Sequence, residues 1–295
     1  MPDVLTALLR RNGLPRAALK RLARGATSEV YRAGEVVVRL GSPFSSFHAD
    51  VAIRRLLLAA GQPVAEPLDH GTLPDGRPYA LDRFVPGGPL EPAGTAQARQ
   101  LGALLAALQR LPCTGYGLLH PDRDPLVGQA RTPLAGLQTR LQDVWPLGAS
   151  TLEQHPLTAG QPRLWPELER LRPDLLALAD APAVLNHTDL HPAQLHWDAD
   201  GRLLALLDFG DAARGPAGWD VASFGYFHGW TLVPALLDGL EAPAGLEREA
   251  QLMGVLLAFH RASRATAQRR PPALEHARHV LRQMLRLLHA PEPRH

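Results

Sequence analysis

Two short apolar runs in the second half of the chain flank a turn sequence. Leu195 and Trp197, with His196 between them, form the first run, and residues 203–207 form the second. Asp198-Ala199-Asp200-Gly201 between the runs is typical of a turn. Gly201 is free to adopt the positive φ that a tight turn needs. The pattern predicts an antiparallel β-hairpin.

Longer segments carry apolar residues at three- and four-residue intervals, which predicts amphipathic helices. These segments are residues 3–11, 47–60, 95–111, 134–145, 164–180, 230–240, 246–263 and 273–289. A shorter helical turn is expected at residues 15–23, and further strands are expected at residues 36–40, 63–68 and 79–85. Pro86-Gly87-Gly88-Pro89 then marks a clear break in composition. The chain therefore reads as an α+β protein whose strands come mostly before this break and whose helices come mostly after it.

The hairpin gathers residues that suit a metal ion. The start of its first strand lies beside the end of its second, so we expect Gln194 and Asp208 to meet at the open end. Asp189 lies in the loop five residues before Gln194. Two carboxylates and an amide supply the oxygen ligands that Mg²⁺ prefers together with substrate phosphates.

The same residues resemble a known family. His187-Thr188-Asp189 and Asp208-Phe209-Gly210 stand nineteen residues apart around the hairpin, with an amide side chain at Gln194. This arrangement resembles the catalytic loop and metal-binding turn of the aminoglycoside phosphotransferase family, small-molecule kinases of the protein-kinase-like fold. The resemblance implies two lobes: a β-rich nucleotide-binding lobe at residues 1–86 and a mostly helical catalytic and substrate lobe at residues 87–295.

The resemblance also implies a role for each residue around the hairpin. Asp189 is the expected catalytic residue, which would orient an acceptor hydroxyl and take its proton. Asp208 and Gln194 are the expected magnesium ligands, although the family usually has Asn at the Gln194 position. His187 and Asp220 are expected to support the loop structurally.

The nucleotide-binding residues are expected upstream. A loop of small residues before residue 36 resembles the family's nucleotide-positioning loop, and a plain β-turn is the alternative interpretation. Its expected nucleotide contacts are Gly25, Thr27 and Ser28, with Ser28 contacting phosphate. Adenine is expected to bind backbone groups of Asp82 and Phe84, near the composition break.

Arg39 and Asp50 replace two residues of the family pattern. Arg39 lies where the family usually has a phosphate-binding lysine, and Asp50 lies where it usually has the helix glutamate that pairs with that lysine. We expect Arg39 and Asp50 to pair, because a longer cation compensates for a shorter acid. The alternative is an exposed arginine and an unrelated surface aspartate.

Composition narrows the class of protein. Of the 295 residues, 45% are hydrophobic and 20% charged, and the formal net charge is +2. No basic-aromatic groove pattern or zinc-finger spacing points to a nucleic-acid partner. No apolar run approaches the roughly 20 residues of a membrane span, and residues 1–24 lack the apolar core of a signal peptide. With Cys113 as the single cysteine, we expect a cytoplasmic protein that has no nucleic-acid or membrane partner.

Charge near the end of the chain bears on the acceptor. Residues 251–295 contain eight arginines and two glutamates. Arg278, Arg282 and Arg286 recur every four residues, which places them on one helix face. A solvated helix face is the alternative reading, but the balance argues against a polycationic acceptor.

The sequence therefore predicts an ATP- or GTP- and Mg²⁺-dependent kinase acting on a hydroxyl of a neutral or anionic small molecule. A nucleotide-binding pseudokinase with a regulatory role is the alternative, since Gln194, Arg39 and Asp50 depart from the family pattern. A protein kinase is disfavoured because no Ala-Pro-Glu segment follows Asp208.

Overall fold

The computed structural model describes residues 8–13, 19–24, 28–42, 45–90 and 93–290. The chain divides into two units. Unit 1 contains Met1–Leu90, His120–Leu126 and Ala193–Gly210. Unit 2 contains Glu91–Leu119, Val127–Pro192 and Asp211–His295. The residues of the predicted hairpin thus belong to the same unit as the strand-rich first part of the chain.

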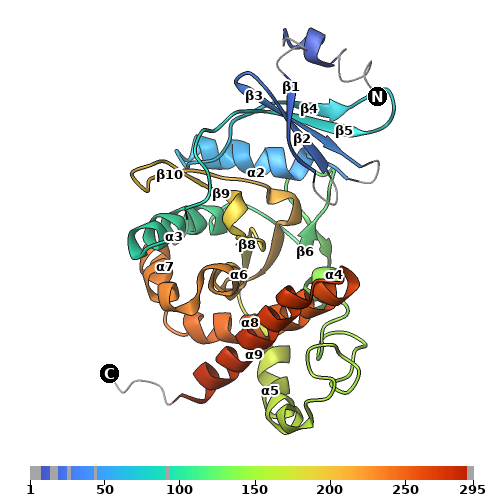
Figure 1. The fold of residues 1–295 in the computed structure, drawn as a ribbon, viewed down its shortest axis with the longest axis vertical. Coiled ribbons are helices and arrows are strands. Elements are labelled where there is room, and N and C mark those ends of the chain that lie inside the picture. The colour runs from blue at the N-terminus through green and yellow to red at the C-terminus, as the bar shows by residue number, and fades with distance from the viewer. Residues whose placement is uncertain (1–7, 14–18, 25–27, 43–44, 91–92, 291–295) are drawn as a thin grey trace. The chain divides into compact units, whose positions relative to one another are not determined.

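Unit 1 is built on a five-stranded antiparallel sheet with the strand order β1-β2-β3-β5-β4. The strands are β1 (Leu19–Arg24), β2 (Ser28–Ala33), β3 (Val36–Gly41), β4 (Pro67–Thr72) and β5 (Pro78–Arg83). Alternate residues of β3, Val38 and Leu40, are buried with Tyr79 and Leu81 of β5. Helix α2 (His48–Ala59) follows β3 and packs against β4 (Figure 1).

The predicted hairpin is present in unit 1. Strands β9 (Leu195–Trp197) and β10 (Leu203–Leu206) pair in antiparallel fashion, and Gly201 in the turn has a φ of 75°. Single β-bridges join Trp197 to Gly88 and Leu206 to Val64. The hairpin is therefore anchored to the N-terminal part of its own unit.

Two expectations for the first part of the chain are wrong. Residues 15–23 were expected to form a helical turn, but Leu19–Arg24 is strand β1, because pairing with β2 overrides the helix-forming residues in it. The strand expected at residues 63–68 lies at Pro67–Thr72 instead. There Pro67 occupies the first strand position, where a missing N–H is tolerated, and β5 supplies the pairing partner.

Unit 2 combines a small sheet with most of the helices. Its four strands have the order β7-β6-β11-β8. They are β6 (Tyr116–Leu119), β7 (Gly128–Ala130), β8 (Ala183–Asn186) and β11 (Ala213–Pro216). The helices are α3 (Thr95–Gln109), α4 (Pro133–Leu141), α5 (Trp165–Ala177), α6 (Gly218–His228), α7 (Val233–Leu240), α8 (Leu246–Ala267) and α9 (Pro271–His289). Short 3₁₀ turns of unit 2 lie at Pro162–Leu164, Leu178–Asp180 and Trp230–Leu232, and two further turns, Pro192–Gln194 and Phe209–Asp211, contain residues of both units.

The helices of unit 2 pack in pairs, α3 with α7, α6 with α8, and α8 with α9. A Cβ atom on Gly102 of α3 would lie 2.3 Å from the carbonyl oxygen of Leu236, so only glycine permits the close contact of α3 with α7. The apolar stripe predicted on the last helix is buried. Among the residues that the structure describes, no helix is both long and apolar enough to cross a membrane.

Candidate active site

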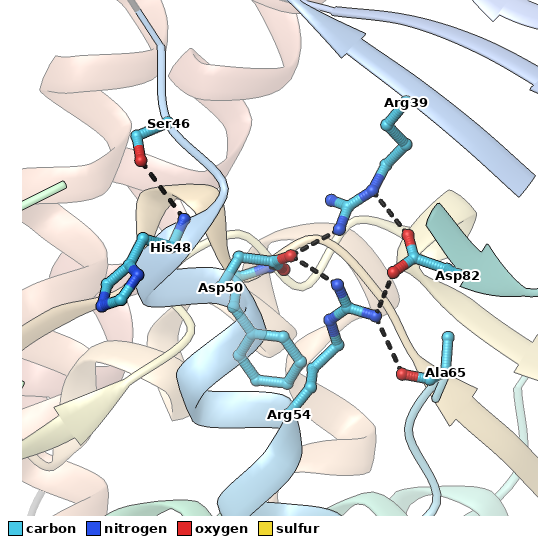
Figure 2. Close-up of polar contacts among 8 residues, drawn as sticks. Arg39, Ser46, His48, Asp50, Arg54, Ala65 and Asp82 are labelled. Carbon is cyan, nitrogen blue, oxygen red and sulfur yellow. Dashed lines mark hydrogen bonds and ion pairs between the residues drawn. The ribbon is translucent and has the colours of Figure 1, made fainter. Parts of the chain in front are cut away.

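Four alternating charges form a closed ring in unit 1. Arg39, on β3, donates from Nε to Asp82 Oδ2 (2.8 Å) and from Nη2 to Asp50 Oδ2 (2.5 Å). Arg54, one turn after Asp50 on α2, donates at 2.7 Å from Nη2 to Asp50 Oδ2 and from Nη1 to Asp82 Oδ1. Figure 2 shows these four side chains, which we call the ion-pair cluster. The predicted pairing of Arg39 with Asp50 is present.

The ion-pair cluster is buried. Side-chain exposure is 13% for Arg39 and at most 7% for the other three residues. Burial by itself would raise the pKa of Asp50, but the charges of Arg39 and Arg54 outweigh burial and hold this pKa well below its usual range. Burial would lower the pKa of Arg39, but the charges of Asp50 and Asp82 raise it. Asp50 and Arg39 are therefore both charged at neutral pH.

Asp50 also fixes the turn that follows the hairpin. Its Oδ1 accepts a hydrogen bond from the backbone N–H of Phe209 (3.0 Å). The Phe209 side chain is buried, and Asp208 before it has a φ of 62°, a left-handed conformation that is uncommon outside glycine. The two oxygens of Asp50 thus join the guanidinium of Arg39 to the turn that carries Asp208.

Gln194 and Asp208 meet at the open end of the hairpin, as its geometry predicts. Gln194 Nε2 lies 3.4 Å from Asp208 Oδ2, and Leu207 N donates to Gln194 O (2.9 Å). A carboxylate and an amide side by side are a donor set that fits Mg²⁺. If the amide group is rotated by half a turn, Gln194 Oε1 takes the place of Nε2 beside Asp208 Oδ2, and both oxygens could bind one ion.

The expected nucleotide contacts divide into three groups. Gly25 and Thr27 lie outside the described residues, and Ser28 is the first residue of β2, opposite Gly41 of β3. The Asp82 side chain belongs to the ion-pair cluster. Phe84 N donates to Glu35 O (2.8 Å), so a nucleobase contact by Phe84 would fall to its carbonyl group.

Arg54 is the member of the ion-pair cluster that the sequence analysis missed. Its side chain is 2% exposed and also donates to the carbonyl oxygen of Ala65 (2.8 Å). The sequence feature that could have revealed Arg54 is its position four residues after Asp50 on a predicted helix. At this spacing an acidic and a basic side chain lie close enough to pair.

In unit 2, α6 holds the loop that carries Asp189. Asp220 Oδ2 accepts from His187 N (2.8 Å), and Asp220 Oδ1 accepts from Thr188 N (2.7 Å). Ser223 Oγ accepts from Leu190 N (2.9 Å), one helical turn further on. Asp189 N in turn donates to His187 Nδ1 (3.3 Å). Asp220 therefore supports the loop, as expected. His187 also stabilises the loop, because its Nδ1 accepts the hydrogen bond from Asp189 N.

Removing the Asp220 carboxylate should destabilise this loop. Asp220 is fully buried, so Asp220→Ala leaves two buried N–H groups without their acceptor. We expect the free energy of unfolding to fall by about 3 kcal/mol. Urea unfolding measures this change, and Asp220→Asn, which keeps one acceptor oxygen, should lose less. A loss below about 1 kcal/mol for Asp220→Ala would contradict the supporting role.

The carboxylate of Asp189 is paired with a cation. Arg261 Nη2, on α8, donates to Asp189 Oδ1 (2.5 Å). The guanidinium carbon of Arg261 also lies 4.8 Å from the ring centre of Phe227. Burial would raise the pKa of Asp189, but the Arg261 charge and hydrogen bond outweigh burial and lower this pKa. Asp189 is therefore ionised at neutral pH, the state in which a carboxylate accepts a proton.

These residues fall within a known family. The model of a phosphotransferase enzyme family matches residues 18–252. The chain belongs to this phosphotransferase family. A comparison with curated proteins gives no match. The family match covers the ion-pair cluster, the hairpin, the Asp189 loop and Asp220, and it ends before Arg261.

Solved structures of phosphotransferases share the fold. A thermostable mutant of aminoglycoside phosphotransferase APH(4)-Ia is 17% identical, with a TM-score of 0.70 over 97% of this chain and 99% of that chain. Its ternary complex with AMP-PNP and hygromycin B is 18% identical, with a TM-score of 0.70 over 96% and 98% of the two chains. The GDP complex of aminoglycoside 2'-phosphotransferase-IIIa is 16% identical, with a TM-score of 0.64 over 97% of each chain. The expected two-lobed protein-kinase-like fold of this family member is confirmed.

Proposed function

We propose that this protein transfers the γ-phosphoryl group of ATP or GTP to a hydroxyl group of a small molecule, with magnesium. The observation that carries the proposal is the double role of Asp50, which binds both Arg39 and the backbone of Phe209. One carboxylate thereby positions a cation suited to phosphate and the turn that carries a metal-binding aspartate. Phosphoryl transfer depends mainly on such positioning and on charge neutralisation.

Asp208 and Gln194 are the proposed magnesium ligands. Their side chains lie side by side at the open end of the hairpin, where Gln194 Nε2 is 3.4 Å from Asp208 Oδ2, and rotation of the amide would present its oxygen instead. Bound magnesium would neutralise charge on the nucleotide phosphates during transfer. Asp50 keeps the Asp208 turn in place through Phe209, so the ligand does not depend on the metal for its position.

Arg39 is the proposed phosphate-binding cation. It is 13% exposed, whereas Arg54 is 2% exposed and both of its terminal nitrogens bind acceptors inside unit 1. Ser28, with Gly25 and Thr27, is proposed to contact phosphate, and the backbone of Asp82 and Phe84 is proposed to contact the base. Of the two arginines in the ion-pair cluster, Arg39 is therefore the one we assign to the nucleotide.

Asp189 is the proposed catalytic residue. It would accept a hydrogen bond from the acceptor hydroxyl and take its proton as the new bond forms. The acceptor oxygen gains a bond to the γ-phosphorus, the bond from that phosphorus to the bridging oxygen breaks, and the nucleoside diphosphate leaves with the electron pair. His187 and Asp220 position the loop and take no part in proton transfer.

The proposed acceptor is a neutral or anionic hydroxyl compound. The solved relatives include complexes with hygromycin B and kanamycin. In this chain, residues 251–295 carry eight arginines and two glutamates. That excess of positive charge disfavours a polycationic acceptor.

A pseudokinase is the second candidate function. It is favoured by Gln194 at a metal-ligand position and by the ion pair of Asp189 with Arg261. The two candidates differ in turnover, since both bind nucleotide.

A phosphate-transfer screen tests the proposal. The protein is incubated with ATP or GTP, magnesium and a panel of sugars, amino alcohols, hydroxy acids and aminoglycosides, and phosphorylated products are detected by mass spectrometry. We expect one compound class to be phosphorylated, and we expect chelation of magnesium or Asp208→Asn to reduce product to background. Nucleotide binding without product on any acceptor would favour the pseudokinase.

The Gln194 position offers a finer test. Gln194→Asn restores the family's usual ligand and shortens the side chain by one methylene. We expect this variant to keep turnover within about tenfold of the wild type and to need less magnesium, whereas Gln194→Ala should lose more, because Mg²⁺ is demanding about ligand geometry. Magnesium titrations of the transfer rate measure both effects. Equal magnesium dependence in all three proteins would remove Gln194 from the set of ligands.

A further inference from the structure

Three arginines of unit 2 lie close enough to the Asp189 carboxylate to interact with its charge. Arg261 and Arg264 lie three residues apart on α8, and Arg140 is on α4. Arg140 Nη1 pairs with Asp211 Oδ2 (2.9 Å), and Arg261 pairs with Asp189. Burial and then the charges of Arg261 and Arg140 lower the pKa of Arg264, so the three guanidinium groups are close enough to repel one another. We call these three residues the arginine cluster.

Two donors of Arg140 lack a partner in the part of the chain that the structure describes. Its side chain is 6% exposed, and Nη1 is occupied by Asp211. Nε and Nη2 are buried and have no hydrogen-bond partner among the described residues. An unsatisfied buried donor is costly, and a charged one more so. The donors Nε and Nη2 of Arg140 could therefore bind an acceptor group that the described residues do not supply.

His260 gives the same indication. It precedes Arg261 on α8, and its Nε2 is also buried without a partner in the described part of the chain. Burial and the charges of Arg140, Arg261 and Arg264 lower the pKa of His260 to about 3, while Asp189 acts in the opposite direction. The imidazole is thus neutral at pH 7 and adds a hydrogen-bonding group but no charge.

The local charges do not balance. The three guanidinium groups face two carboxylates, Asp189 and Asp211, which leaves one positive charge in excess. Arg264 is exposed, so water solvates part of this charge, whereas Arg140 is buried and still has two donors to satisfy. An anionic group would balance the arginine cluster and satisfy its remaining donors.

We propose that the arginine cluster binds an anionic group, a carboxylate or a phosphate, of the acceptor molecule. This inference rests on the proposed function and names its substrate class: a hydroxyl compound that also carries an acid. The acid replaces Asp189 as the partner of Arg261, because a guanidinium binds a carboxylate or phosphate equally well in the two-pronged geometry. Asp189 is thereby released to accept the proton of the hydroxyl.

This exchange of partners at Arg261 gives a reason for the ion pair between Arg261 and the proposed catalytic carboxylate of Asp189. While Arg261 occupies Asp189 Oδ1, that oxygen is less basic and less accessible to a hydroxyl. An acid-bearing acceptor removes this restraint, whereas a neutral alcohol has to compete with it. A polycation would be repelled by the arginine cluster. The arginine cluster therefore favours acceptors that carry a negative charge near their hydroxyl group.

Matched acceptor pairs test the proposal. Transfer is measured for gluconate and glucose, for glycerate and glycerol, and for glucose 6-phosphate and glucose. We expect kcat/KM to favour the acidic member of at least one pair by more than tenfold. Arg261→Leu should reduce that preference by about 10- to 100-fold, mainly through KM, because a charged hydrogen bond is lost. Arg282→Leu, an exposed arginine on α9, is the matched control and should leave the preference unchanged.

Binding gives a second readout that does not need turnover. Calorimetry measures the affinity of glutarate, an acid without a hydroxyl group. Because glutarate competes with Asp189 for Arg261, Asp189→Asn should bind it about tenfold more tightly than the wild type, and Arg261→Leu should bind it at least tenfold more weakly. Equal glutarate affinity in all three proteins would overturn the proposal, as would a wild-type enzyme that phosphorylates neutral alcohols with no effect of Arg261→Leu. Tight glutarate binding without transfer to any acceptor would instead reject the proposed function alone.

Discussion

Asp189→Asn should reduce the rate of phosphate transfer by a factor of about 10² to 10⁴, the usual contribution of a general base. The substitution replaces a carboxylate by an amide of nearly the same shape, so the acceptor hydroxyl loses its proton acceptor while the loop keeps its conformation. That loop is held by Asp220 and Ser223 through the backbone of neighbouring residues, not through the Asp189 side chain. We therefore expect nucleotide affinity to change little, whereas the melting temperature should fall because Arg261 loses its ion pair.

The measurement is the steady-state rate of nucleoside diphosphate release with the best acceptor found in the screen. Asp180→Asn is the matched control, because Asp180 is an exposed residue of the same unit. It should retain full activity. A fully active Asp189→Asn enzyme would show that another group takes the proton.

Asp50→Asn should lower the free energy of unfolding by about 3–5 kcal/mol, because it leaves two buried guanidinium groups with half of their partners. Arg39 and Arg54 would then share the single carboxylate of Asp82. The Phe209 amide would also lose a charged acceptor, so we expect nucleotide and magnesium binding to weaken with stability. Urea unfolding in the presence and absence of magnesium nucleotide measures both effects.

Glu66→Gln is the control for this variant. Glu66 pairs with Arg83 in the same unit, but the two side chains are 49% and 58% exposed. An exposed pair contributes at most about 1 kcal/mol. A similar loss in Asp50→Asn and Glu66→Gln would show that the ion-pair cluster is no more important than a surface contact.

The contribution of Asp50 to the free energy of unfolding should also depend on pH. Its pKa in the folded protein lies well below the ordinary value of 3.8. The stabilisation is therefore fully present above about pH 4 and is lost as the pH falls, because the unfolded chain takes up the proton first. Below pH 4, the stability difference between the wild type and Asp50→Asn should narrow by about 1.4 kcal/mol per pH unit. A difference that stays constant down to pH 2.5 would contradict the assignment.

Local sequence patterns were enough to predict the hairpin and the contact between Gln194 and Asp208 at its open end. Its strands are joined by the short segment 198–202, so the meeting of Gln194 with Asp208 follows from β-pairing alone. The pairing of Arg39 with Asp50 was predicted from resemblance to a family pattern rather than from local chemistry. The support of the Asp189 loop by Asp220 was predicted in the same way.

Contacts between distant parts of the sequence were not predictable in this way. Asp82 joins Arg39 through the register of β3 with β5, which no local pattern determines. Arg261 reaches Asp189 from a helix that reads as an ordinary amphipathic segment. Strand β1 was mistaken for a helical turn because its residues form helices readily and only the neighbouring strand makes them extended.

Phosphorus NMR of one reaction mixture shows whether this protein transfers phosphate from ATP to a hydroxyl group. The wild-type protein is combined with ATP, magnesium and the acceptor from the screen, beside Asp189→Asn and Asp208→Asn. We expect a phosphate ester resonance that grows in step with ADP in the wild type and stays at background in both variants. Release of inorganic phosphate without any ester, or ester formation that persists in both variants, would contradict this expectation.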